Sequence, residues 1–453
     1  MKPLFPLLLI ALLSSPFAAK GAKYYSEIKE SQMLPVELDS PYILISGSNY
    51  SSRTKDTIYF QRHSDHLLSM GTSESKLNPV KAHTTTGIVI SFKTASPGIQ
   101  LRFSVLEGEN RGHNFAVYQN GAYTDEFTFN AQAGPELTFD INSLDQGNEV
   151  FYEITLPNWS ITAMTGLHLD SGYDLSALEK TDRPIYVAYG NSITHGTGQS
   201  GTHKTYPFLV SKILDIALFN IAVGGSKTST ATAQMLRDDF EEIDIMTMLI
   251  GYNDFNGEGI DTIEYRSRYL HFLNTFREVH KNTLIYCISL TYTTNELSVK
   301  TGIPADDFRS VVRNIVREFN NMGDLGIIFI EGDEITSEIN LKDAVHFTEE
   351  GAELFAIELA KILDTSPSRT SGNQADRNEK IKLFPNPNSG KFFIQSAKEI
   401  ESFKVFSLNG KLLNAQDWHG PSIDLRYLSP GYYILSANYS DNSKSNKVPF
   451  CIK

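Results

Sequence analysis

Cysteine is scarce in this sequence, which has only two among 453 residues, Cys287 and Cys451. They fall in regions that we expect to belong to different domains, so no disulfide framework is predicted. Basic residues are also in short supply, because 40 Lys and Arg face 53 Asp and Glu, for a net charge of −13. Without a basic tract for phosphate groups or anionic lipids, we do not expect a nucleic-acid partner.

Long apolar runs are missing as well, apart from a short one at the N-terminus. The first residues, MKPLFPLLLIALLSSPFAAKGAK, have an early Lys, an apolar core and then small residues, which is the layout of a secretory signal peptide. This core is shorter than the roughly 20 residues that a spanning helix needs. We therefore expect residues 1–21 to be a signal peptide and the mature chain to be exported without a membrane span. A buried N-terminal helix is the alternative, which Pro6 and Pro16 disfavour.

Metal-binding patterns are not evident either. The residues His83, His113, His195, His203 and His280 are scattered, with no His, Cys or Asp spacing that resembles a zinc site. We expect no metal and no other cofactor.

What is present first is a region of strand-like alternation, over residues 23–175. Ile88, Ile90 and Phe92 recur at every second position, and the runs around 99–105 and 137–141 repeat the pattern. Asn120-Gly121 separates two further runs, which favours a hairpin because both residues accept positive φ. We predict an N-terminal β-sandwich or jelly roll, whose function stays open between supporting the next domain and contacting carbohydrate.

The hydrophobic period changes between residues 182 and 364. Helix-length segments there, such as TIEYRSRYLHFLNTFREVH, have apolar residues at i, i+3 and i+4. Between them lie largely apolar runs, typical of strands that are covered on both faces: IYVAY, LFNIA, IMTMLI, LIYCISL and GIIFI. This alternation predicts an α/β fold with a doubly wound parallel sheet. Ligands of such sheets bind at the carboxyl ends of the strands.

Small and polar residues follow four of these five runs. The segments are Gly190-Asn191-Ser192, Gly224-Gly225, Gly251-Tyr252-Asn253-Asp254, and Asp343 with His346. Each alone has an ordinary explanation, since a Ser after a strand is often a helix N-cap and a Gly pair is often a turn. Four of them at one edge of one sheet indicate a functional site.

These segments resemble the signature blocks of the SGNH hydrolases, also called GDSL esterases and lipases. The resemblance covers residues 182–364 and implies a flavodoxin-like three-layer α/β/α fold. It implies that Ser192 is the nucleophile and that Asp343 and His346 complete a catalytic triad. It also implies that the oxyanion-hole donors are the backbone N–H of Ser192, the backbone N–H of Gly225 and the side-chain amide of Asn253.

One residue departs from the family pattern, because Asn191 stands where the family has Asp. In the family this Asp supports the turn, and an Asn can still accept a hydrogen bond there. Three neighbours stay open: His195 as a pocket residue or a solvated loop residue, and Tyr252 and Phe255 as packing or substrate contacts.

A second resemblance covers residues 381–453, beyond a polar linker at 365–380. Phe384-Pro385-Asn386-Pro387, KVFSLNGK and IDLRYLSPGYYIL resemble the C-terminal sorting domain of the type IX secretion system of Bacteroidetes. The resemblance implies that this small β-sandwich directs export to the cell surface or beyond, with the secretion machinery as its partner. A carbohydrate-binding β-module is the alternative.

The order of domains resembles that of secreted carbohydrate O-acetyl esterases, among them acetylxylan esterases. We therefore expect a secreted serine esterase that hydrolyses O-acyl, above all O-acetyl, esters of carbohydrates through an acyl-enzyme on Ser192. One alternative is a lipase, lysophospholipase or thioesterase of the GDSL type that acts on longer acyl chains. Another is a non-catalytic glycan-binding surface protein, although a degenerate site would be expected to lose Ser192, Asn253 or His346.

Overall fold

The computed structural model describes residues 32–453 except 131–133, 180–181, 365–380, 387, 397, 419, 421 and 441–446. The predicted signal peptide at 1–21 and the predicted linker at 365–380 lie outside the described residues.

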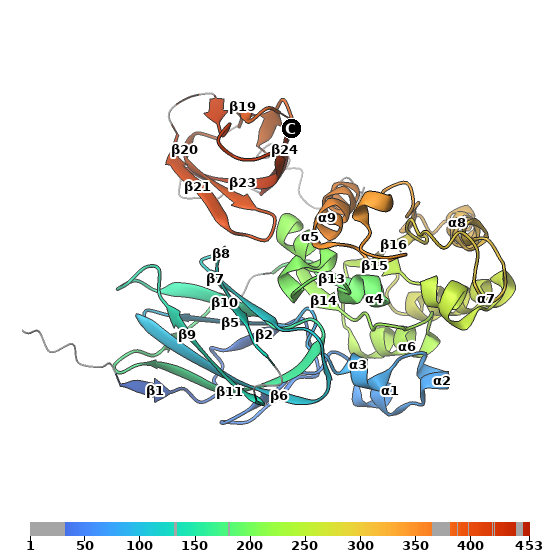
Figure 1. Ribbon diagram of the computed structural model, residues 1–453, viewed down its shortest axis with the longest axis horizontal. Coiled ribbons are helices and arrows are strands. Elements are labelled where there is room, and N and C mark those ends of the chain that lie inside the picture. The colour runs from blue at the N-terminus through green and yellow to red at the C-terminus, as the bar shows by residue number, and fades with distance from the viewer. Residues whose placement is uncertain are drawn as a thin grey trace, which may run out of the picture. The chain divides into compact units, whose positions relative to one another are not determined.

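The N-terminal region forms two antiparallel sheets (Figure 1). One has the order β3-β4-β11-β6-β9 with β1 beside β11, and the other has the order β12-β5-β10-β7-β8 with β2 beside β5. The bounds are β1 Met33–Pro35, β2 Leu44–Ser46, β3 Ser52–Arg53, β4 Ile58–Tyr59, β5 Val89–Thr94, β6 Gly98–Asn110, β7 Asn114–Gln119, β8 Ala122–Thr128, β9 Glu136–Asn142, β10 Val150–Thr155, β11 Ser160–Asp170 and β12 Leu175–Ser176.

Alternating residues of the two sheets form one shared core, as the period-2 pattern predicts. Ile90 and Phe92 of β5 lie in the same apolar cluster as Leu101 of β6 and Phe139 of β9, and all four are buried. Asn120-Gly121 joins β7 to β8, with φ of +50° and +81° at the two residues. The predicted β-sandwich and its hairpin are therefore confirmed.

Three short helices between β4 and β5 were not predicted. They are α1 Asp65–Ser69, α2 Thr72–Ser75 and α3 Pro79–Ala82. Local signals for them exist, because the Ser64 side chain caps α1 and Asn78 caps α3 just before Pro79. Leu67 and Leu77 join the core of the following α/β region rather than that of the sandwich.

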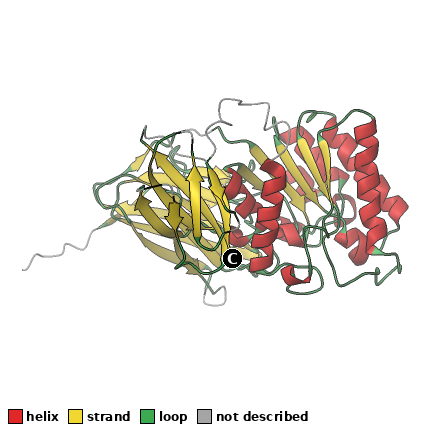
Figure 2. Cartoon of the chain, turned by 90° about the horizontal axis from the view of Figure 1, so that it is seen from above, coloured by secondary structure: helices red, strands yellow, loops and turns green. Residues whose placement is uncertain are grey.

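The central region is an α/β fold with five parallel strands in the order β14-β13-β15-β16-β17. This is the flavodoxin-like order, and it confirms the predicted fold class. Figure 2 shows the strands of this sheet with helices on both sides. The strands are β13 Ile185–Gly190, β14 Ala217–Asn220, β15 Ile245–Leu249, β16 Leu284–Ile288 and β17 Ile327–Ile330. The helices are α4 Ser192–His195, η2 Thr202–Lys204, α5 Tyr206–Leu214, α6 Thr230–Asp239, η3 Asn253–Glu258, α7 Thr262–Arg277, α8 Ala305–Asn321, η4 Glu338–Asn340 and α9 Glu349–Asp364.

Both faces of this sheet are buried, which explains why its strands are apolar throughout. Along β13, Val187 and Tyr189 belong to the cluster that holds the core residues of α6, α7 and α8. Tyr186 and Ala188 belong to the cluster that holds those of α5 and α9. Successive side chains of the strand thus enter different layers.

The C-terminal region has two antiparallel sheets and a core of its own. The sheets have the orders β18-β19-β22 and β21-β20-β23-β24. The strands are β18 Lys382–Phe384, β19 Lys391–Gln395, β20 Ile400–Ser407, β21 Leu412–Asp417, β22 Ser422–Asp424, β23 Gly431–Tyr439 and β24 Val448–Ile452. Both cysteines are free and buried, Cys287 in β16 and Cys451 in β24. Among the described residues, no helix is both long and apolar enough to cross a membrane.

Candidate active site

Ser192 is the first residue of α4 and follows directly after β13. The strand ends in Gly190 because the chain is packed too tightly there for a side chain. A Cβ at Gly190 would lie 2.6 Å from Cβ of Thr194 and 2.8 Å from the carbonyl oxygen of Leu249. The sharp turn leaves Ser192 half-buried at the carboxyl edge of the sheet.

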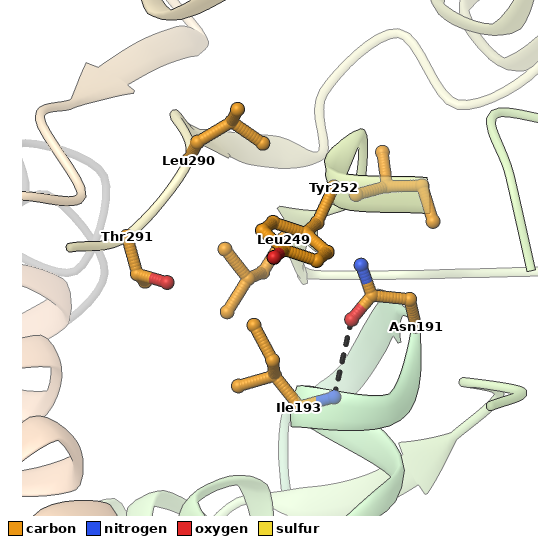
Figure 3. A pocket seen from close by; sticks show the side chains of 7 residues that line it. Asn191, Ile193, Leu249, Tyr252, Leu290 and Thr291 are labelled. Carbon is orange, nitrogen blue, oxygen red and sulfur yellow. Dashed lines mark hydrogen bonds between the residues drawn. The ribbon is translucent and has the colours of Figure 1, made fainter. Parts of the chain in front are cut away.

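Asn191 caps the helix that Ser192 begins. Its Oδ1 accepts the backbone N–H of Ile193 at 3.1 Å, as Figure 3 shows. The side chain borders a small pocket whose other lining residues are Ile193, Leu249, Ile250, Tyr252, Leu290 and Thr291. An amide oxygen supplies the same acceptor as a carboxylate oxygen, so the departure from the family's Asp leaves the turn capped.

The side chains of Ser192, His346 and Asp343 form a chain of hydrogen bonds. Ser192 Oγ lies 2.8 Å from His346 Nε2. The other ring nitrogen, Nδ1, lies 2.8 Å from Oδ2 and 3.0 Å from Oδ1 of Asp343. With Nδ1 donating to the carboxylate, Nε2 is left to accept from the hydroxyl, which is the arrangement that makes a Ser oxygen nucleophilic.

Asp343 is held in place by its own loop. Its Oδ1 accepts the backbone N–H of Val345 at 3.0 Å and that of His346 at 2.9 Å. Burial raises the pKa of Asp343, but these two N–H donors and the imidazole outweigh burial, so the pKa lies below its ordinary value. The carboxylate is therefore ionised at neutral pH and can orient the ring.

The loop that carries His346 is tied to neighbouring segments. Gln199, which follows the nucleophile helix, donates from Nε2 to the carbonyl of Phe347 at 2.8 Å. Thr293, beyond β16, donates from its hydroxyl to the carbonyl of Ala344 at 2.8 Å. These bonds keep His346 near Ser192 although more than a hundred residues separate them in the sequence.

Gly225 lies in a tight turn after β14. The N–H of Ser226 donates to the carbonyl of Val223 at 3.0 Å, and φ at Gly225 is +84°. Glycine suits this position because other residues disfavour such a φ. The turn packs against the end of β13, because Val223 N–H and Ser226 Oγ both donate to the Gly190 carbonyl, at 3.3 Å and 3.0 Å.

Asn253 begins η3, directly after β15. Its Nδ2 donates to the carbonyl of Ser226 at 3.0 Å, so the side chain is anchored on the turn that contains Gly225. A carboxamide carries two N–H groups, and one of them remains for a ligand.

Asp254, which follows Asn253 directly in the sequence, is a supporting residue whose role was not predicted. Its carboxylate accepts the N–H of Thr228 at 3.0 Å and the guanidinium of Arg268 at 3.1 Å. Burial raises the pKa of Asp254 to about 6, and these donors offset part of that effect. Asp254 thus ties η3 both to the loop after β14 and to α7.

The structure shows where the three neighbours left open by the sequence lie. His195 is fully buried, so it is neither a pocket residue nor a solvated loop residue. Phe255 is also fully buried and packs edge-on against Phe308, which is a packing role. Tyr252 is half-buried, and its hydroxyl accepts from Asn295 Nδ2 at 2.7 Å.

Metal sites are not evident in the described part of the chain, where no cluster of three or more His, Cys, Asp or Glu residues has suitable geometry.

The sequence of the α/β region matches a known family. Residues 188–354 match the GDSL-like lipase/acylhydrolase family. They form a GDSL-like hydrolase domain. The protein is therefore a serine ester hydrolase of the SGNH type, as the sequence predicted.

Solved structures share this fold at low sequence identity. The salicylyl-acyltransferase SsfX3 from a tetracycline biosynthetic pathway is 19% identical, with a TM-score of 0.63 over 74% of this chain and 98% of that one. A protein described as a GDSL-like lipase from Bacteroides ovatus is 18% identical, with a TM-score of 0.58 over 74% and 97%. The acetyl xylan esterase Est2A from Butyrivibrio proteoclasticus is 13% identical, with a TM-score of 0.51 over 74% and 98%. A match of this length extends beyond the α/β domain.

Residues 382–450 match the secretion system C-terminal sorting domain. This confirms the second resemblance and indicates that the protein is exported. No curated protein has a sequence significantly similar to this chain.

Proposed function

We propose that this protein is a secreted esterase that removes O-acetyl groups from carbohydrates through an acyl-enzyme on Ser192. The observation that carries the proposal is the 2.8 Å contact between Ser192 Oγ and His346 Nε2, with Asp343 on the far side of the ring. This contact lies within the segment that matches the GDSL-like family.

The proposed reaction has two halves. His346 takes the proton of Ser192 as Oγ bonds to the ester carbonyl carbon, and Asp343 stabilises the imidazolium. Collapse of the tetrahedral intermediate breaks the bond to the sugar oxygen, which leaves with the proton from His346. Water then attacks the acyl-enzyme and gives a proton to His346, which passes it to Ser192 Oγ as the bond between that oxygen and the acyl carbon breaks and acetic acid is released.

The oxyanion of both tetrahedral intermediates needs donors that are already in place. We assign this role to the backbone N–H groups of Ser192 and Gly225 and to Nδ2 of Asn253. The assignment is supported by the turn at Gly225, which packs on the end of β13, and by the anchoring of Asn253 on that turn.

Carbohydrate as the substrate class is supported by domain architecture. Est2A and several carbohydrate esterases of family two align over at least 97% of their own length, beyond the α/β domain of this chain. Because one fold can serve many substrates, acetyl specificity is tested directly by the experiment below.

Export is the second part of the proposal. We assign residues 1–21 as the signal peptide and the C-terminal domain as the address read by the type IX secretion machinery. The sorting-domain match supports the latter assignment. The enzyme would then act at the cell surface or in the medium, where polymeric glycans are accessible.

The first experiment measures acetate released from acetylated xylan and other acetylated glycans, beside acetyl and long-chain nitrophenyl esters, for wild type and Ser192→Ala. We expect serine-dependent acetate release from a glycan and little activity on long acyl chains. Activity on long chains alone would replace the proposal with a lipase or thioesterase. The absence of serine-dependent activity on every ester would favour the glycan-binding alternative.

A further inference from the structure

A stack of three side chains lies beside the turn that contains Gly225. The ring of Trp159, which immediately precedes β11 of the sandwich, lies flat on the ring of His195, with centroids 3.9 Å apart and planes 6° apart. The guanidinium of Arg111 covers Trp159 at 4.0 Å from the ring centre. Trp159 is 5% exposed and His195 is fully buried, so this stack is part of the packed interior.

His195 is hydrogen-bonded at both ring nitrogens. Its Nδ1 accepts the backbone N–H of Gly224 at 2.9 Å. Its Nε2 lies 3.0 Å from the carbonyl of Asn158 and 2.9 Å from the hydroxyl of Thr84, which donates its own proton to the Lys81 carbonyl. Nε2 therefore carries the proton and Nδ1 is free of it.

This neutral form is kept by the surroundings. Burial lowers the pKa of His195 well below its ordinary value, and the positive charge of Arg62 lowers it further. The ring thus remains an acceptor for Gly224 N–H across the range in which an ordinary histidine would take up a second proton.

Gly224 is enclosed by the same stack. A Cβ at Gly224 would lie 2.0 Å from the edge of the Trp159 ring, so the backbone rests directly on the indole. Gly225 comes next and is bracketed by two hydrogen bonds, from Gly224 N–H to His195 and from Ser226 N–H to Val223. Its own N–H has no acceptor within the described residues, and Gly225 is exposed.

We propose that His195 and Trp159 are positioning residues, which hold the Gly224 peptide so that the N–H of Gly225 points at the oxyanion. The inference rests on the proposed function, since it assigns the means by which one donor of that oxyanion hole is oriented. It gives the N-terminal β-sandwich a part in catalysis, because Trp159 and Asn158 both belong to it. Asn158 also donates from Nδ2 to the Gly196 carbonyl at 2.9 Å, which fixes the end of α4.

Two amide substitutions distinguish the effect of the hydrogen bond at Nδ1 of His195 from that of the hydrogen bond at Nε2. The amide oxygen of Asn is as many bonds from Cβ as Nδ1 of His, so His195→Asn retains an acceptor for Gly224 N–H. The amide nitrogen of Gln is as many bonds from Cβ as Nε2, so His195→Gln retains only the donor to Asn158. His195→Leu removes both. His280 provides a matched control, because it is also buried, stacked on Phe276 and bonded to a carbonyl, that of Leu236.

The kinetic constants kcat and KM on an acetyl ester are measured for these variants, together with thermal unfolding. We expect His195→Gln and His195→Leu to lose roughly tenfold or more in kcat with KM nearly unchanged, short of the roughly 10²- to 10³-fold cost of removing an oxyanion donor. His195→Asn should recover part of that loss. His280→Gln should lower the unfolding temperature without changing kcat.

Trp159→Phe keeps an aromatic ring of smaller area, and its kcat alone tests the inference if the His195 variants unfold. We expect it to lower kcat, and to do so non-additively with His195→Gln, because both act through the Gly224 peptide. An unchanged kcat for Trp159→Phe, equal kcat for the Asn, Gln and Leu variants, or additive effects of the two sites would overturn the inference. Ser192→Ala distinguishes this outcome from failure of the proposed function, since a fully active Ser192→Ala would overturn both.

Discussion

The side chain of Asn253 donates a hydrogen bond to the carbonyl of Ser226 at 3.0 Å, and this bond joins the loops that follow β14 and β15. The two loops supply two of the three proposed oxyanion donors. A change at Asn253 therefore removes one donor and loosens the segment that carries another.

For Asn253→Ala we expect kcat to fall by roughly 10²- to 10³-fold while KM changes little, because the lost hydrogen bond is made to the transition state. Steady-state kinetics on an acetyl ester measure this. The control is Asn256→Ala on the same turn of helix, where the amide donates to the Tyr252 hydroxyl at 3.3 Å. An effect on KM alone would mean that Asn253 binds the substrate in its ground state.

For Asp343→Asn we expect kcat to fall by about 10²-fold or more. The amide still accepts the backbone N–H groups, but it no longer stabilises a charged His346. Because Asp343 is exposed, its side chain being 51% accessible, we expect little change in thermal unfolding. A variant with nearly full kcat would show that His346 works as a base without a carboxylate partner.

Asn191 offers a test of the turn. Asn191→Leu removes the acceptor for Ile193 N–H, and loss of such a cap costs about 1 kcal/mol of unfolding free energy. Asn191→Asp retains an acceptor and should keep more of the stability and activity. Chemical denaturation of both variants measures the difference. If Asp proves no better than Leu, the cap is not what Asn191 contributes.

Arg62 is 2% exposed and donates to five backbone carbonyls. The three shortest of these bonds go to Thr84 at 2.7 Å, Asn220 at 2.7 Å and Ala222 at 2.9 Å. Arg62→Met leaves these buried acceptors without a donor, at about 1 to 3 kcal/mol for each unsatisfied group. We expect a large fall in unfolding temperature. Arg317→Met on the exposed face of α8 is the control and should change it little. Similar unfolding temperatures for the two variants would contradict this account.

The pH dependence of stability tests the protonation state of His195. The pKa of His195 is lowered in the folded protein, first by burial and then by Arg62. Below about pH 6.5, therefore, the imidazole of His195 takes up a second proton only in the unfolded chain. The unfolded state then binds more protons, and stability falls as the pH falls. Asn cannot titrate, so the stability advantage of wild type over His195→Asn should shrink by up to about 1.4 kcal/mol per pH unit in that range.

Thermal unfolding of both proteins between about pH 7.5 and pH 5 measures this difference. The other buried histidines, His63 among them, are present in both proteins and cancel. A difference that stays constant with pH would show that His195 takes up the proton equally in the folded and unfolded states, so that the fold does not keep it neutral.

The sequence predicted those parts of the fold that depend on local pattern. Strands covered on both faces are apolar at every position, as in β13, and strands of a sandwich alternate, as in β5. Both patterns can be recognised from one segment of sequence, without knowing which other segments pack against it. The helices α1 to α3 were missed because they are only four or five residues long and are stabilised by packing on another region.

The site was predictable to the extent that its residues lie at strand ends. Ser192, Gly225 and Asn253 follow β13, β14 and β15, and the resemblance to known blocks supplied their roles. The environment of His195 was not predictable, because the residues that bury it, Asn158 and Trp159, come from a different domain. No spacing in the sequence indicates that contact.

The contact between Trp159 and His195 has an optical consequence. The chain contains two tryptophans, Trp159 and Trp418. With Trp418 replaced by Phe, all indole emission would come from a ring that lies on an imidazole at 3.9 Å and against the backbone of Gly224. The protein thus holds an intrinsic fluorophore at the junction of sandwich and hydrolase, and its emission would report whether that junction shifts when an acyl group is bound to Ser192.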